Sequence, residues 1–189
     1  MRNRIRLLFV SAALAGAVTA AFAVTDKKSE KRACVDGLCS TISIRIADGG
    51  LNLPDGATII GDVDLSGTEI IRLPRNFRVI GNLDLRHSWI NELPENLLVL
   101  GSLNLSRTGV TELPKNFVVG GSLDLSYTGI LKLPEGLIVG HDLVLNNTVI
   151  SSVPDSLSVG GDLNLRNTIV SALPNNIWVR GRVYFPDSF

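Results

Sequence analysis

The chain has 189 residues, with 18 basic and 18 acidic side chains, 45% hydrophobic residues and only 5% aromatic residues. Three of the basic residues lie in the first 23 positions, so the remainder carries 15 basic against 18 acidic side chains. This balance leaves no clustered basic face of the kind that neutralises phosphates, so we expect no nucleic-acid partner. The length suits a single domain.

Residues 1–23 have the pattern of a signal peptide. Arginines at positions 2, 4 and 6 precede an apolar stretch, and Ala21-Phe22-Ala23 has the small-x-small form of a cleavage site. We therefore expect export by a Sec-type signal to the periplasm or beyond, with residues 24–33 as a disordered linker. The alternative is an uncleaved anchor, because residues 7–24 are just long enough to span a bilayer. Only in that case would the chain contact a membrane.

Residues 34–52 are expected to form an N-terminal cap on the region that follows. They contain the only two cysteines of the chain, Cys34 and Cys39. In an exported protein, a close cysteine pair predicts a local disulfide. A redox or metal pair is the alternative, and a metal would need two further ligands nearby.

A 20-residue unit recurs from residue 53 to residue 189, and each unit begins with Leu-Pro or Val-Pro, as in LPENLLVLGSLNLSRTGVTE. A fixed period of this length indicates a solenoid, in which each unit is one coil and only stacking buries its apolar face. Six apolar positions recur in every unit and predict a continuous core. The second position after each proline is mostly Gly or Asn, which predicts a tight left-handed turn. The short spacing leaves no room for a long helix.

The repeat resembles that of leucine-rich repeat proteins, whose strand motif is L-x-x-L-x-L-x-x-N-x-L. Ile60, Val63, Leu65, Thr68 and Ile70 match its spacing. The period of 20 with a Leu-Pro pair is similar to the short bacterial subclass, known from secreted effectors that in some cases carry a C-terminal ubiquitin-ligase domain. The resemblance implies a mostly β solenoid of about seven coils with one short parallel strand each. A parallel β-helix with two narrow sheets is the alternative.

Two features depart from the family pattern. The motif's Asn is replaced by Thr or Ser in every unit, and we expect this hydroxyl to bond the backbone of a neighbouring coil. The motif's first apolar position becomes Gly120, Gly140 and Gly160 in the later units. The chain also shows no cysteine in or after the repeats, no nucleophile–base set, no cofactor motif and no metal cluster, and its seventh unit ends at Phe189. We therefore expect no enzyme activity, no ligase domain and no cofactor.

The positions between the inward strand residues should face outward, on the sheet that forms the concave partner-binding face of leucine-rich repeats. Beside them runs a rim that includes His87, Arg107 and Tyr127, and Arg and Tyr are common at binding hot spots. A Ca²⁺ site is not expected, because no unit places several carboxylates around one point. An ordinary solvated surface is the alternative to a partner-binding one. The candidate partner-binding residues are Asp64, Asp84, Arg86, His87, Asn104, Arg107, Asp124, Tyr127, Asn164 and Arg166.

Four large apolar residues, Trp89, Leu98, Leu100 and Trp178, fall at positions expected to be exposed or partly exposed, where they would form a second patch or a dimer contact. The principal hypothesis for function is an exported module that binds a protein through its concave strand face. The alternative is a structural or envelope solenoid, a spacer that assembles with itself, since the last strand would present an open edge. The chain would then be either a monomer or an end-to-end homo-oligomer.

Overall fold

The computed structural model describes residues 50–51 and 53–186, together with the backbone of four short strands nearer the N-terminus. The expected signal peptide, linker and cap fall largely outside the described residues. Within that segment, β2 (Ala33–Val35) and β3 (Leu38–Ser40) pair antiparallel, and their backbone register sets Cys34 opposite Cys39. The Cys34–Cys39 disulfide stays a prediction. A second antiparallel pair, β4 (Ile46–Ala47) and β5 (Gly50–Leu51), leads into the repeats.

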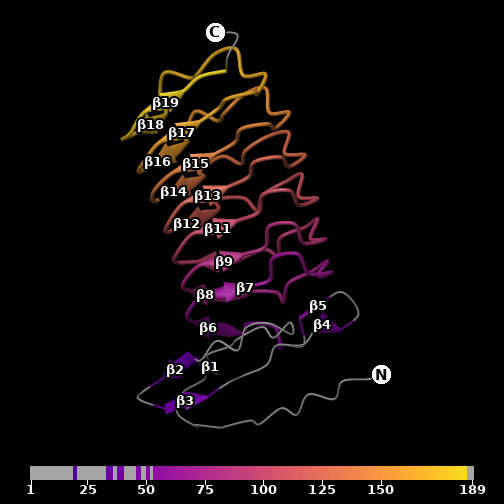
Figure 1. The fold of residues 1–189 in the computed structure, drawn as a ribbon. Coiled ribbons are helices and arrows are strands. Elements are labelled where there is room, and N and C mark those ends of the chain that lie inside the picture. Colours follow the sequence, from indigo (N-terminus) through magenta and orange to yellow (C-terminus); the bar gives the residue numbers. More distant parts are fainter. Residues whose placement is uncertain are drawn as a thin grey trace.

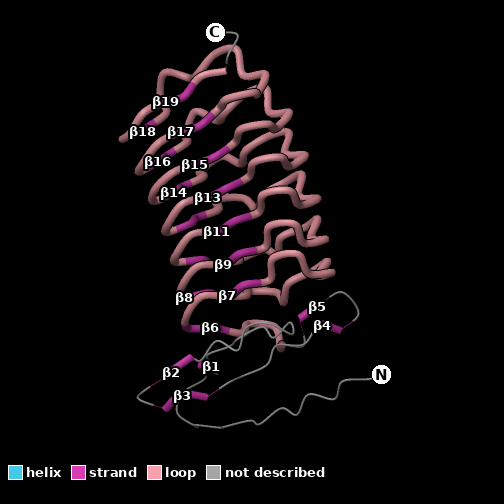
Figure 2. Tube along the Cα trace, viewed as in Figure 1, coloured by secondary structure: helices cyan, strands magenta, loops and turns pink. Residues whose placement is uncertain are grey.

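The repeats stack as a column of coils, and Figure 1 shows the chain climbing this column from β6 to β19. Each coil holds two short strands separated by a corner, and loops make up the rest of it (Figure 2). Corresponding strands of successive coils lie 20 residues apart and pair in parallel, as Val79 does with Val99 and Leu83 with Leu103. Among the described residues there is no helix.

The strands form two parallel sheets that run along the column. The first sheet also accepts β1 (Thr19–Ala20) beside its first repeat strand. The repeat strands of the first sheet are β6 (Thr58–Ile60), β8 (Arg78–Ile80), β10 (Leu98–Val99), β12 (Val118–Val119), β14 (Ile138–Val139), β16 (Ser158–Val159) and β18 (Trp178–Val179). The strands of the second sheet are β7 (Val63–Asp64), β9 (Leu83–Asp84), β11 (Leu103–Asn104), β13 (Leu123–Asp124), β15 (Leu143–Val144), β17 (Leu163–Asn164) and β19 (Val183–Tyr184).

The expected architecture, a mostly β solenoid with about 20 residues in each coil, is confirmed. Each coil carries two strands rather than one, which is the feature that the β-helix alternative predicted. The physical reason lies in the residues before each corner, such as Leu98 and Val99, which are as extended and as well paired as those after it. Their ladder is continuous, with Leu98 N–H donating to Phe77 O at 3.0 Å and Leu100 N–H to Val79 O at 3.0 Å.

The core is a set of six apolar columns, one residue of each column per coil, as the repeat predicts. In the middle of the stack, Val119, Leu123, Leu125 and Ile130 are each 0% exposed. Full burial of an aliphatic side chain contributes about 1.5–3 kcal/mol. Since every coil adds the same set, stability accumulates along the column rather than around one centre.

Two local expectations need correction. The left-handed turn after proline is confirmed at Gly56, Asn76, Asn96, Asn116 and Gly136, but the backbone at the corresponding Ser156 and Asn176 is not left-handed. The Thr/Ser hydroxyls bond within their own coil rather than to a neighbouring one. Thr128 Oγ1, for example, donates to Leu125 O at 2.6 Å, because the loop after the second sheet turns back over that carbonyl.

Candidate partner-binding face

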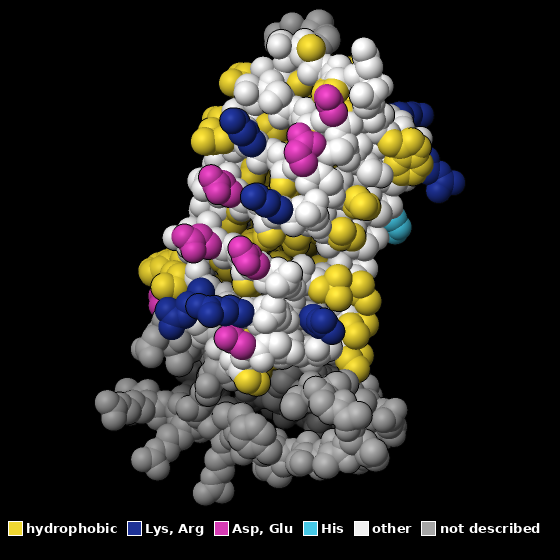
Figure 3. Space-filling model, turned by 180° about the vertical axis from the view of Figure 1, so that it is seen from behind, with side chains coloured by type: hydrophobic (Ala, Val, Ile, Leu, Met, Phe, Trp, Pro, Cys, Tyr) yellow, Lys and Arg dark blue, Asp and Glu magenta, His cyan; other side chains and the backbone are white. Residues whose placement is uncertain are grey.

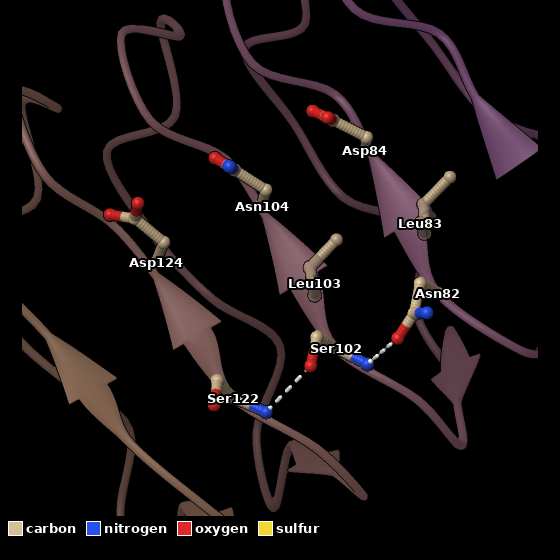
Figure 4. A pocket seen from close by; sticks show the side chains of 8 residues that line it. All are labelled: Asn82, Leu83, Asp84, Ser102, Leu103, Asn104, Ser122 and Asp124. Atoms are coloured by element: carbon tan, nitrogen blue, oxygen red, sulfur yellow. Dashed lines mark hydrogen bonds between the residues drawn. The ribbon is translucent and has the colours of Figure 1, made fainter. Parts of the chain in front are cut away.

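The outward side chains of the second sheet form a regular strip. Asp64, Asp84, Asn104 and Asp124 come from four successive strands, β7 to β13, and each is in direct register with the next. Figure 4 shows the last three of them projecting side by side from their strands. Strands in a sheet lie about 4.8 Å apart, so three carboxylates and one amide share one narrow band. We call these four residues the acidic strip.

One oxygen of each strip side chain is already committed to the fold. The Oδ1 atoms of Asp64, Asp84, Asn104 and Asp124 accept the backbone N–H two residues further on, at 3.0, 3.0, 2.9 and 2.9 Å. Such Asx turns close the end of each strand. The second oxygen of Asp84 forms an ion pair with Arg86 Nε at 3.1 Å. The strip therefore has a structural role in each of these four coils.

A second outward column, just before each strand, joins consecutive coils. Asp62 Oδ1 accepts Asn82 N–H at 2.7 Å, and Asn82 Oδ1 accepts Ser102 N–H at 2.7 Å. The chain of bonds continues through Ser102, Ser122, Asp142 and Asp162 to the backbone of Arg182. These side chains therefore connect the backbones of consecutive coils. The sequence signal for this role is a small acceptor, Asp, Asn or Ser, at one position of six consecutive units.

The acidic strip borders a shallow hollow on the second sheet. Figure 4 shows this hollow with the Asn82–Ser102 and Ser102–Ser122 bonds along one side. Asp84 and Asp124 are its only charged residues, so a basic group would complement it. The lining consists of Asn82, Leu83, Asp84, Ser102, Leu103, Asn104, Ser122 and Asp124.

The rim beside the strip is conformationally unusual. His87, Arg107 and Tyr127 are exposed and have left-handed backbones, with φ of 57°, 57° and 58°. Gly67, Asn147 and Asn167, the residue types that suit this region, occupy the same position in other coils. The guanidinium carbon of Arg107 lies 4.2 Å from the centre of the Tyr127 ring, in a cation–π contact. Three bulky side chains thus occupy positions where the backbone favours Gly or Asn.

The predicted site residues do not all come together. Asp64, Asp84, Asn104 and Asp124 form the strip, while His87, Arg107 and Tyr127 form its rim. Asn164 and Arg166 belong to a separate group further along the column, because Val144 stands between Asp124 and Asn164 in the sheet register. There Arg166 lies over the Tyr184 ring, 4.7 Å from its centre. The sequence did not indicate this second cation–π pair, because it joins residues 18 positions apart on neighbouring coils.

The described residues contain no group of three His, Cys, Asp or Glu side chains placed to hold a metal ion. In the same part of the chain, no helix has the length and apolar character needed to cross a membrane. Comparison with protein-family models, with curated proteins and with solved structures finds no match to this chain.

Proposed function

We propose that this protein is an exported binding module that recognises a protein partner through the acidic strip and its rim. A repeat solenoid suits a binding or structural role, because it holds side chains of successive coils at fixed intervals on a rigid face. The strip offers acceptor groups for a basic segment, and the rim offers an aromatic ring and two nitrogen-bearing side chains. The rim residues follow the strip residues by three positions in each coil.

The observation that carries this proposal is the row His87, Arg107 and Tyr127. A non-glycine residue in the left-handed region costs about 1–2 kcal/mol. The fold does not need these side chains, since Gly67 and Asn147 serve equally at the same position. This free-energy cost at three adjacent exposed positions supports the proposal that the three side chains are selected for contact with a binding partner.

The resemblance to leucine-rich repeats and the export of the protein are two further parts of the proposal. The strand motif that resembles leucine-rich repeats runs through the second sheet, with Leu83 and Leu85 inward and Asp84 outward. This is the sheet on which members of that family bind partners. Export rests on the residue pattern of positions 1–23, and mass spectrometry of the protein from its native cell envelope and medium would test it. A chain that begins at residue 24 is the expected result.

The test of partner binding is a comparison of two variants with equal charge loss. The face variant combines Asp84→Asn, Arg107→Asn and Asp124→Asn, and Asn already serves in both columns at Asn104 and Asn147, so the fold should be retained. The control combines Glu95→Gln, Lys115→Gln and Asp155→Asn, all exposed and away from the second sheet. Each set removes two acidic and one basic side chain.

Partners are captured from the native envelope fraction by wild type, face variant and control. We expect a partner that wild type and control both retain and the face variant loses at least tenfold, with capture by wild type weakening as salt rises. Equal capture by all three proteins would contradict the proposal and favour the structural spacer.

A further inference from the structure

The outward face of the first sheet carries exposed aliphatic side chains. Ile80, Leu100, Val118 and Ile138 are 43%, 51%, 41% and 46% exposed, and Ile60 and Leu98 beside them are half-buried. Seen from behind in Figure 3, hydrophobic side chains line the margin of the stack on the side of this sheet. Arg78 and Arg180 are the only charged residues on this face. Contiguous exposed apolar surface is the kind of feature that marks an interaction site.

The face has two outward columns, and one of them changes character halfway along the stack. It begins with Ile60, Ile80 and Leu100 and continues with three consecutive glycines, Gly120, Gly140 and Gly160. No side chain fits at these glycines: a Cβ at Gly140 would lie 2.0 Å from Gly120 O, and one at Gly160 would lie 2.0 Å from Gly140 O. One half of the column therefore projects, and the other half is bare backbone.

The other column is apolar at its centre. It runs Thr58, Arg78, Leu98, Val118, Ile138, Ser158 and Trp178, with Val118 and Ile138 directly paired in the sheet. Because neighbouring coils repeat every 20 residues, a two-fold axis that runs parallel to the strands and lies outside the sheet, over β12, relates these positions in pairs. This axis places each coil on one side of β12 opposite the coil at the same distance on the other side of β12 in the second copy. Each column therefore faces the same column of the second copy.

We propose that this face binds a second copy of the chain, with the two columns of coils antiparallel and the two first sheets face to face. On this axis, Val118 meets Val118 of the second copy, and Leu98 meets its Ile138. The projecting Leu100 and Ile80 meet the bare backbone at Gly140 and Gly160, and Arg78 meets Ser158. The same axis sets Ile60 against Arg180 of the second copy, and no like charges are opposed.

The face is narrow, because each strand contributes only two outward positions to it, whereas a stable interface buries about 800 Å² on each partner. We therefore expect a reversible dimer that dissociates at micromolar concentration, rather than a permanent one. The second-sheet face lies on a different surface of the coil, so dimerisation leaves the acidic strip of both copies exposed. The proposed dimer is independent of the proposed partner-binding function.

Sedimentation velocity across a concentration series tests this proposal on the full chain. Wild type is expected to shift reversibly from monomer to dimer. Val118→Arg, which places two arginines against each other on the axis, is expected to weaken the dimer at least tenfold. The matched control is Val149→Arg, the same substitution at a valine that is 53% exposed on another surface. It should dimerise like wild type.

A charge-swap experiment makes the test specific to the axis. Val118→Arg and Val118→Glu proteins should each be monomeric alone and should form a mixed dimer when combined, because position 118 faces itself. Three results would overturn the proposal: wild type that remains monomeric at the highest concentration, a dimer that survives Val118→Arg, or a mixture that stays monomeric.

Discussion

The two sheets of this solenoid share one period and one core but use their outward positions in opposite ways. On the second sheet, outward Asp, Asn and Ser side chains are hydrogen-bonded to backbone N–H groups of their own coil or the next. On the first sheet, the outward positions in the middle of the stack, from Leu98 to Gly140, hold aliphatic residues and glycines. An outward-facing side chain is therefore not automatically available to a partner. On the second sheet, the polar side chains already bond backbone N–H groups of this chain, whereas the aliphatic side chains of the first sheet are exposed.

The largest expected difference in stability between the two faces comes from replacing one glycine by alanine on each face. Gly140→Ala on the first face drives a Cβ into Gly120 O, and we expect a loss of about 3–5 kcal/mol or failure to fold. Gly67→Ala on the rim of the second face has open space around its Cβ and only a left-handed φ of 65° to satisfy. It should cost about 1 kcal/mol. Urea unfolding of both variants measures the difference, and similar costs would show that the glycine column is not sterically required.

A smaller effect separates the polar residues of the two faces. Asp142→Ala removes the acceptor for the Asp162 N–H and should cost about 1 kcal/mol, whereas Asp142→Asn keeps an acceptor and should be nearly neutral. Ser158→Ala on the first face is the matched control, since the Ser158 hydroxyl has no hydrogen-bond partner among the described residues, and it should change the free energy of unfolding by less than about 0.5 kcal/mol. An unchanged free energy of unfolding in Asp142→Ala would mean that the inter-coil bond contributes nothing.

The smallest effect has the opposite sign. His87→Gly relieves a left-handed φ of 57° without disturbing the Arg107–Tyr127 contact. Because glycine also adds entropy to the unfolded chain, we expect a net stabilisation of about 0.5 kcal/mol. If partner binding is lost at the same time, His87 is retained for function at a cost in stability. A thermal melt beside the capture assay reports both, and a destabilised variant would contradict the assignment of strain.

Much of the fold could be read from individual columns of residues. Leu103, Leu105 and Val110 recur every 20 residues, and their burial followed directly from that recurrence. The acidic strip was also predictable as a surface, because Asp84 alternates with inward Leu83 and Leu85. The role of Ser102 was not predictable in the same way, since its hydroxyl bonds a backbone group that belongs to the next coil, 20 residues away.

The sequence by itself determined the period, the inward columns and the positions that require Gly or a turn, because a stacked coil repeats the same local constraints in each unit. Only the tertiary structure decided where each coil bends, and therefore that two sheets form rather than one. It also decided which polar side chains meet a neighbouring N–H and which aliphatic ones are left outside. Those outcomes depend on contacts between residues 20 positions apart, and a pattern within one coil does not contain them.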